Sequence, residues 1–197
     1  MSGEMSGEPR RYKAFDGTHQ VLIETAVRLI ADRGVDALSL SALAREADVN
    51  RTTVYYHFKD RDALVDAVKL WSSEQIVQAF RPDLPQAERI DYITRFSIAN
   101  PEIMKLWIEE FTSPGEMRAS YPHWEGLVAG VERSFANAPP GEEVDAEVYG
   151  VMLLTAALIG PRVFRNRVNP AASDAVVIER FRREQQRALK RDGLLEG

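Results

Sequence analysis

Apolar residues recur along the chain at the three- and four-residue spacing of helices, and no stretch alternates cleanly as a half-buried strand does. In the first helical segment, residues 18–33, the apolar side chains that share one face are Leu22, Ala26, Leu29 and Ile30. Thr18 can cap the start of this helix and Gly34 can end it. The pattern predicts an all-α protein.

Two short helices are predicted next, over residues 41–47 and 51–57. Small hydroxyl side chains at Ser39 and Ser41 favour the start of the first helix, and Asn50 is a good cap for the second. The turn between the helices is too tight for antiparallel packing, so the helices must cross steeply. Because helices on either side can pack against this pair, the pattern predicts a helix-turn-helix module.

Prolines and glycines divide the rest of the chain into longer helices. The predicted ranges are 61–79, 86–99, 101–111, 117–137, 144–168 and 173–191, with a disturbance at Gly160-Pro161. The fold class is therefore all-α, with an amino-terminal three-helix helix-turn-helix domain followed by a larger helical domain.

The composition indicates a globular protein in a reducing compartment. Hydrophobic residues make up 45% of the chain, which is enough for a core. No continuous apolar run approaches the ~18 to 20 residues of a membrane span, and residues 1–17 lack the apolar centre of a signal peptide. The absence of cysteine excludes disulfides, thiolate metal sites and a cysteine nucleophile. We therefore expect a cytoplasmic protein without a membrane partner.

The charge is distributed unevenly along the chain. The net charge of −5 argues at first against nucleic acid as a partner. Residues 9–61, however, hold nine Lys and Arg against seven Asp and Glu, a charge of +2. Residues 62–197 hold 16 basic and 21 acidic groups, a charge of −5, and Glu4 and Glu8 account for the remainder. The mildly basic part of the chain is thus the part that contains the short helices.

The stretch VNRTTVYYHFKDRDAL, residues 49–64, combines small hydroxyls, aromatic rings and cations. Thr52 and Thr53 are small enough to let a helix approach a major groove, and Arg51 can reach a guanine edge or a phosphate. Core positions for Tyr55 and Phe58 and a cap for His57 remain alternatives. The side chains that can donate to phosphate oxygens are Tyr55, Tyr56, His57, Lys59 and Arg61.

The sequence IETAVRLIADRGVDALSLSALAREADVNRTTVYYHFKDRDALVDAV resembles the amino-terminal domain of TetR-family transcriptional regulators. The resemblance is close over residues 18–68 and extends to the rest only in the number and size of helices. It implies that Ser39 and Ser41 start the first helix of the motif, and that Arg61 stands where a phosphate-binding lysine is usual. It also implies a recognition helix that contains Arg51, Thr52, Thr53, Tyr55, Tyr56 and His57. Asp48 replaces the usual glycine of the turn, which aspartate tolerates better than most residues.

The resemblance also implies a function. We expect a ligand-responsive transcriptional regulator that is not an enzyme and needs no cofactor or metal. It would be a homodimer that binds a palindromic double-stranded DNA operator as a repressor, and a small, largely apolar effector would release it. The expected domains are a flexible tail at residues 1–17, a DNA-binding domain at 18–62 and a ligand-binding and dimerisation domain at 63–197.

Within the larger domain, flexible methionines and flat aromatic rings can enclose an apolar ligand, although plain core positions are the alternative for each. The candidate ligand-binding residues are Tyr92, Phe96, Met104, Trp107, Phe111, Trp124 and Met152. A dimer face is expected on the last two long helices, where small residues permit close packing. Its candidates are Val148, Met152, Thr155, Ala156, Ile159, Val176, Val177, Arg180 and Phe181.

Two other classes of function remain open at this point. A helical bundle enzyme with a metal site usually needs Glu-x-x-His pairs, and none of His19, His57 and His123 follows a glutamate by three residues. Glu109, Glu110 and His123 are more simply explained as solvated groups. A helical adaptor that binds only protein would not need the Arg-Thr-Thr and Tyr-Tyr-His sets.

Overall fold

The structure is a computed structural model that describes residues 8–81, 83–136 and 144–192. Within these ranges the regular elements are all helical, which confirms the all-α prediction. The chain divides into two compact units, Met1–Trp71 and Ser72–Gly197. The division falls inside a helix that runs from Arg61 to Val77, and not at residue 62 as predicted.

The first unit contains α1 (Glu8–Arg33), the 3-10 turn η1 (Val35–Ala37), α2 (Leu40–Glu46), α3 (Arg51–His57) and the start of α4 (Arg61–Val77). The prediction of a flexible tail is wrong for residues 8–17, because these residues begin α1. The only proline among them, Pro9, lies in the first helical turn, where its missing amide is tolerated. Residues 1–7 lie outside the described part of the chain.

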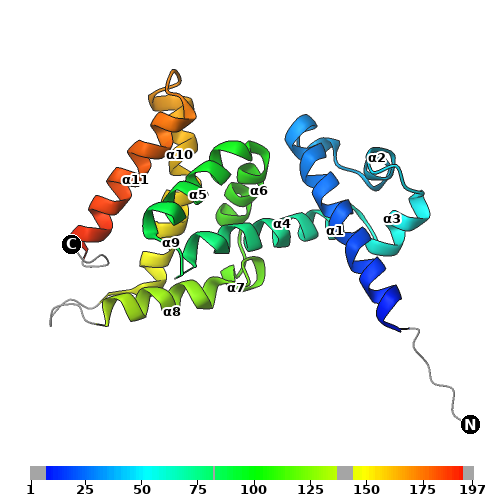
Figure 1. The fold of residues 1–197 in the computed structure, drawn as a ribbon, viewed down its shortest axis with the longest axis horizontal. Coiled ribbons are helices and arrows are strands. Elements are labelled where there is room, and N and C mark those ends of the chain that lie inside the picture. Colours follow the sequence, from blue (N-terminus) through cyan, green and yellow to red (C-terminus); the bar gives the residue numbers. More distant parts are fainter. Residues whose placement is uncertain (1–7, 82, 137–143, 193–197) are drawn as a thin grey trace, which may run out of the picture. The chain divides into compact units, whose positions relative to one another are not determined.

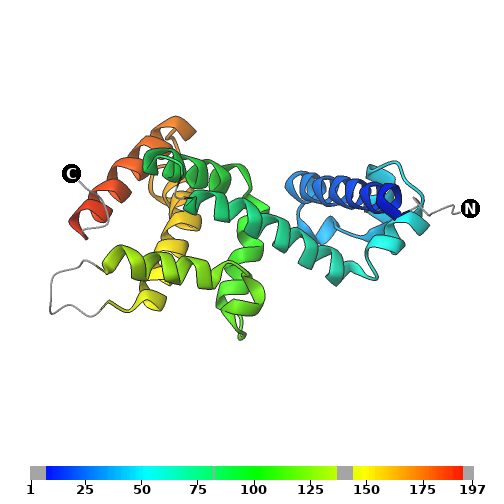
Figure 2. The same ribbon diagram turned by 60° about the horizontal axis from the view of Figure 1, so that its bottom comes forward.

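The core of the first unit lies where α1 meets the two short helices. The predicted apolar face of α1 is buried, since Leu22 and Ile30 are both 0% exposed. Leu43 of α2 and Val54 of α3 are also 0% exposed and complete the core. Figure 1 shows α2 and α3 on the same side of α1, and Figure 2 shows the same elements, in dark blue to cyan, from a turned view.

The turn between α2 and α3 depends on one left-handed residue. Asp48 has a φ of 52°, the conformation that the sequence predicts for this position. The flanking caps are also as predicted: Ser39 Oγ accepts the Ala42 amide at 3.1 Å, and Asn50 Oδ1 accepts the Thr52 amide at 2.9 Å. The crossing of the two helices is therefore fixed by local interactions.

Replacing Asp48 by glycine is expected to raise the free energy of unfolding by about 0.5 to 1 kcal/mol, because glycine adopts a positive φ without a steric penalty. Replacing Asp48 by alanine is the matched control and is expected to lower the same quantity by a similar amount. Urea denaturation followed by circular dichroism measures both changes. A shift of both variants in the same direction would show that φ is not the cause.

The second unit is built from short and medium helices. They are η2 (Gln78–Phe80), α5 (Gln86–Ala99), α6 (Pro101–Thr112), α7 (Met117–Ser120), α8 (Trp124–Phe135), α9 (Ala146–Leu158), α10 (Gly160–Val163), the π-helical turn η3 (Phe164–Val168) and α11 (Asp174–Arg191). The helix predicted over residues 117–137 is wrong as a single element, because Pro122 interrupts it between α7 and α8. The predicted disturbance at Gly160-Pro161 is confirmed as the junction between α9 and α10.

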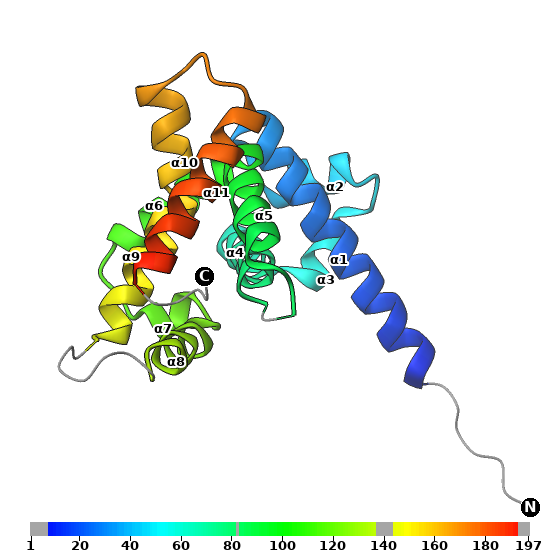
Figure 3. The ribbon, with the colours of Figure 1, turned by 60° about the vertical axis from the view of Figure 1, so that its left-hand side comes forward.

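Helix α5 is central to the second unit and packs against α9, α10 and α11. Figure 3 shows α11, in red, alongside α5, in green. At the break in the α9 helix, Ser97 Oγ of α5 donates to Leu158 O at 2.6 Å, and Arg162 Nη1 donates to Ile98 O at 3.2 Å. Nearby, a β-carbon added to Gly160 would lie 3.0 Å from Phe181 Cε1 of α11. The break is therefore held by one side chain and one backbone carbonyl of α5, and α11 packs closely against it.

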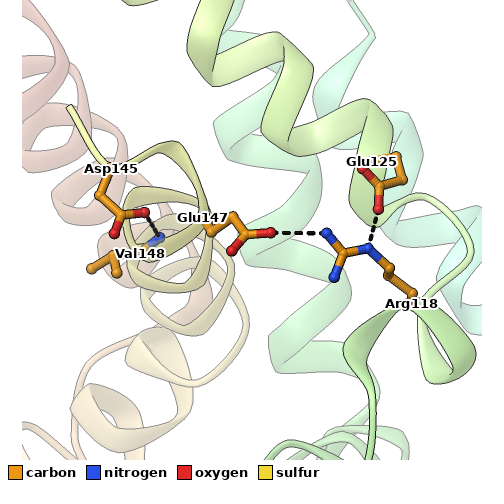
Figure 4. Close-up of polar contacts among 5 residues, drawn as sticks. All are labelled: Arg118, Glu125, Asp145, Glu147 and Val148. Atoms are coloured by element: carbon orange, nitrogen blue, oxygen red, sulfur yellow. Dashed lines mark hydrogen bonds and ion pairs between the residues drawn. The ribbon is translucent and has the colours of Figure 1, made fainter. Parts of the chain in front are cut away.

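An exposed ion-pair network joins α7, α8 and α9. Arg118 of α7 lies between Glu125 and Glu147, which belong to the first turns of α8 and α9, and its Nη2 is 2.9 Å from Glu147 Oε1 (Figure 4). Asp145 caps α9 by accepting the Val148 amide at 3.0 Å. Exposed pairs of this kind contribute little stability, so the network mainly orients the short α7.

Candidate nucleic-acid interface and apolar surfaces

The two faces of α3 differ in burial and in chemistry. Val54 is 0% exposed, and Phe58, which ends the helix, is 2% exposed, so both belong to the core. Tyr55 and Tyr56 are 56% and 67% exposed. On this helix the exposed predicted residues are Arg51, Thr52, Tyr55 and Tyr56, while Thr53 and His57 are half-buried. A basic group and polar aromatic rings thus form the outward face of a helix whose inner face is anchored.

The remaining predicted residues lie at the ends of the short helices. Ser39 is the cap of α2, and Ser41 lies half-buried in its first turn. Lys59 lies in the segment between α3 and α4, with 82% of its side chain exposed. Its ammonium is 3.8 Å from the Asp60 carboxylate, which is a loose and exposed pair. The Lys59 charge therefore stays accessible from solvent.

His57 is packed against a second histidine. Its ring centroid lies 5.4 Å from that of His19 on α1, and the His19 ring lies 5.0 Å from that of Phe58. Burial lowers the pKa of His57 from its usual value, and electrostatic interaction with the His19 ring lowers the pKa further. At neutral pH the His57 imidazole is therefore mainly neutral, and a phosphate placed beside it would favour its protonated form.

Arg61 has backbone partners that sequence reasoning missed. Its Nε donates to Leu38 O at 3.0 Å, and its Nη2 donates to Val35 O at 3.0 Å. Both acceptors lie in the loop between α1 and α2. A pattern of residue types carries no signal for such contacts, because any backbone carbonyl can accept them.

The candidate ligand-binding residues fall into three groups by exposure. Phe96, Met104, Trp107 and Trp124 are buried, Tyr92 and Phe111 are half-buried, and Met152 is 59% exposed. The structure brings Trp107 and Phe111 together, with ring centroids 5.3 Å apart, but places Met152 on the exposed side of α9. The seven residues therefore do not line one common space.

The buried aromatic group also contains a residue that the sequence analysis missed. Tyr121 is 1% exposed, and its ring meets the Trp107 ring edge-on at a centroid distance of 5.9 Å. Burial raises the pKa of Tyr121 well above its usual value. Trp107 Nε1 donates to Ser72 Oγ of α4 at 2.9 Å. The position of Tyr121 directly before a proline was the available sign that the helix ends there and that the ring can turn inward.

A shallow apolar groove lies on the outer side of α9, α10 and η3. It is lined by Met152, Thr155, Ala156, Ile159, Gly160, Val163, Phe164 and Val168. Four candidates for the dimer face are in this groove, and Val148 and Val176 are exposed apolar residues on α9 and α11. Val177 is instead 0% exposed, so its assignment to an outer face is wrong; its side chain fills the core of the unit. The Arg180 guanidinium lies 4.6 Å from the centroid of the Phe164 ring.

The residues that line this groove all belong to the segment Ala146–Val168. By length and composition alone this segment could cross a membrane, and 28% of its most apolar 18-residue window is buried. The search for a continuous apolar run missed it because Arg162 and Arg165 interrupt the sequence. Composition does not distinguish a helix that spans a membrane from a helix whose apolar face is covered by another protein. The helix break at Gly160-Pro161 and the charged groups after it favour a surface that meets protein.

In the described ranges no group of three His, Cys, Asp or Glu residues is placed to hold a metal ion. The two arginines that follow the Gly160-Pro161 break both have partners. Arg162 donates a hydrogen bond to Ile98 O, and Arg165 forms an ion pair with Asp174 of α11.

The arrangement of α1 to α4 defines a helix-turn-helix protein. Residues 22–68 match the family described as bacterial regulatory proteins of the tetR family. These residues are thus similar to the amino-terminal domain of that family, in agreement with the resemblance drawn from the sequence.

Comparison with curated proteins is confined to the amino-terminal part of the chain. The HTH-type transcriptional regulator AcrR of Shigella flexneri is 37% identical over 51 residues, which are 26% of this chain and 24% of AcrR. The match thus spans about a quarter of that relative. The named relatives are transcriptional regulators and not enzymes, in agreement with the expectation of a non-enzymatic protein.

Solved structures resemble most of the chain. A protein of unknown function from Rhodococcus sp. RHA1 is 26% identical, with a TM-score of 0.59 over 84% of this chain and 94% of that chain. AibR, solved with isovaleryl coenzyme A and operator DNA, is 22% identical, with a TM-score of 0.53 over 83% of this chain and 95% of that chain. These likenesses confirm the predicted fold, a helix-turn-helix domain followed by a larger helical domain.

Proposed function

We propose that this protein is a DNA-binding transcriptional regulator that acts in the cytoplasm as a homodimer. In this proposal it represses from a palindromic operator and is released by a small, largely apolar molecule. The observation that carries the proposal is the outward face of α3, where Arg51, Thr52, Tyr55 and Tyr56 are exposed on a helix anchored by Val54. The family match over the same residues supports it.

The chemistry of this face suits a major groove. Arg51 is the first residue of α3 and can form paired hydrogen bonds with a guanine edge. Tyr55, Tyr56 and Lys59 carry donors that suit phosphate oxygens. Because one short helix reads few base pairs, two copies are needed, with recognition helices about 34 to 36 Å apart on successive major grooves.

Selection of genomic fragments by the purified protein tests the proposal. The expected result is enrichment of a fragment with two inverted half-sites, together with affinity that falls steeply as salt rises. Equal retention of all fragments would contradict a sequence-specific regulator.

Replacing Arg51 by alanine is expected to weaken binding to the recovered operator by about 1 to 3 kcal/mol and to relax the preference at one base position. Lys59→Ala is the matched control for a phosphate contact. It is expected to weaken all sites nearly equally and to reduce the salt slope by about one. Affinity measured by fluorescence anisotropy against single-base operator variants separates the two. An altered base preference in Lys59→Ala but not in Arg51→Ala would exchange these roles.

The second copy is proposed to pack on the groove defined above. The groove is apolar and formed by α9, α10 and η3, and α11 carries a further exposed apolar residue, Val176. Exposed apolar area of this kind is stabilised by contact with a matching surface, and a two-fold axis presents the same surface twice. A dimer of this kind gives the two recognition helices that a palindromic operator requires.

The effector is proposed to bind among the aromatic residues of the second unit. Trp107, Phe111 and Tyr121 form a connected group of rings, and the half-buried Phe111 is its most accessible member. The complex of AibR with isovaleryl coenzyme A and operator DNA supports a response to a molecule with an apolar part. Such a molecule must prefer one conformation of the dimer, because equal affinity for both would shift nothing.

Titration with a panel of apolar carboxylic acids, acyl thioesters and aromatic drugs, read by tryptophan fluorescence and operator binding together, tests the effector. The expected result is one compound that changes both signals at the same concentration. Phe111→Ala is expected to weaken this response while operator binding without the compound is unchanged. A full response in Phe111→Ala would remove that residue from the site.

A further inference from the structure

Arg61 links the two segments that flank the helix-turn-helix. It is the first residue of α4 and follows the end of α3 closely. Its Nε donates to Leu38 O and its Nη2 to Val35 O, each at 3.0 Å. Both carbonyls precede α2. The two hydrogen bonds therefore join the chain before the motif to the chain after it.

The contact needs the planar fork of a guanidinium. Nε and Nη2 lie on one edge of the plane and can meet two carbonyl oxygens at once. The acceptors are themselves held in a 3-10 turn, because Val35 O also accepts the Leu38 amide at 3.1 Å. A lysine ammonium is a compact donor on a flexible stem and cannot hold both carbonyls in the same way.

The loop that Arg61 holds determines where α2 begins. Leu38 is 1% exposed and directly precedes Ser39, the cap whose Oγ accepts the Ala42 amide. Helix α2 in turn packs against α3. A displacement of the Leu38 carbonyl would therefore move the start of α2 and, with it, the helix that carries Arg51.

We propose that Arg61 is a positioning residue, which sets the orientation of α3 through the loop between α1 and α2. Its contribution to DNA binding then depends on the shape of the guanidinium and not on its charge alone. This inference rests on the proposed DNA binding. It assigns to Arg61 a role that differs from the phosphate contact implied by the resemblance.

Operator affinity per active dimer, measured at several salt concentrations for Arg61→Lys and Arg61→Ala, tests the inference. Arg61→Lys is expected to bind about tenfold more weakly than the wild type, the effect of losing one hydrogen bond from a charged group, and Arg61→Ala, which loses both, is expected to bind at least as weakly. Arg61→Lys is expected to keep the wild-type salt slope, because its charge is kept. Amide hydrogen exchange over residues 38–42 is expected to become faster in Arg61→Lys.

The controls are the variant Val68→Ala and the wild-type protein. Val68→Ala is expected to destabilise the same unit at a core position two turns along α4 from Arg61, and it should bind the operator as the wild type does once the folded fraction is matched. Wild-type affinity in Arg61→Lys would overturn the inference, because charge alone would then suffice. An equal loss in Val68→Ala would overturn it as well. If the wild type binds no operator, the proposed function fails too, whereas failure of the positioning role alone leaves wild-type binding intact.

Discussion

A glutamate in place of Met152 is expected to convert the dimer into monomers and to weaken operator binding by more than about a hundredfold. Met152 is 59% exposed on α9 and lines the apolar groove proposed as the dimer face. Two-fold symmetry places a new carboxylate twice in the same interface, and burial of an unpaired charge costs several kcal/mol. Each monomer would then retain only one recognition helix.

Sedimentation velocity at micromolar concentration measures the assembly, and a gel shift with the operator measures binding. Ile108→Glu is the matched control, because Ile108 is also apolar and exposed but lies on α6, outside the groove. This variant is expected to remain dimeric and to bind DNA. A Met152→Glu protein that sediments as a dimer would move the interface to another surface.

Replacing Trp107 by alanine is expected to lower the free energy of unfolding by about 3 to 5 kcal/mol. The side chain is 1% exposed and contacts the rings of Phe111 and Tyr121. Alanine would leave a cavity and would also remove the donor to Ser72 Oγ. A loss of this size is a large part of the stability of an ordinary domain.

Urea denaturation followed by circular dichroism measures this change. Trp107→Phe keeps most of the ring volume and is expected to cost less, mainly the lost hydrogen bond and part of the packing, about 1 to 2 kcal/mol. Phe111→Ala, at a half-buried position, is expected to cost less than Trp107→Ala. A loss below about 1 kcal/mol for Trp107→Ala would show that the surrounding helices close the space freely.

The parts of the fold that the sequence predicts best are those fixed by neighbouring residues. The bounds of α3 are as predicted because Asn50 caps the helix from one position before it, and the turn at Asp48 needs a residue that tolerates a positive φ. The single helix predicted over residues 117–137 fails for the opposite reason. Its apolar spacing continues across Pro122, so periodicity alone does not reveal the break.

The candidate sites contain exposures and contacts that the order of residues alone does not reveal. Met152 was a candidate for both the ligand site and the dimer face, because α9 is apolar on several sides and its spacing does not tell which side is covered. The partners of Arg61 lie 23 and 26 residues away along the chain, so only the fold brings them together. The exposure of Arg51 and Thr52 could be predicted, since Val54 is the aliphatic position around which α3 turns toward the core.

The close approach at Gly160 has a consequence for partner choice. A β-carbon at this position would lie 3.0 Å from Phe181 Cε1, so even an alanine here requires the Phe181 ring to move by a few tenths of an ångström. A larger residue would displace this ring further and reshape the groove between Met152 and Val168. Where two proteins of one family share a cell, mixed dimers form only if their surfaces fit. In the dimer proposed above, the side chain absent from Gly160 would help a copy of this chain to recognise another copy of itself and to reject its relatives.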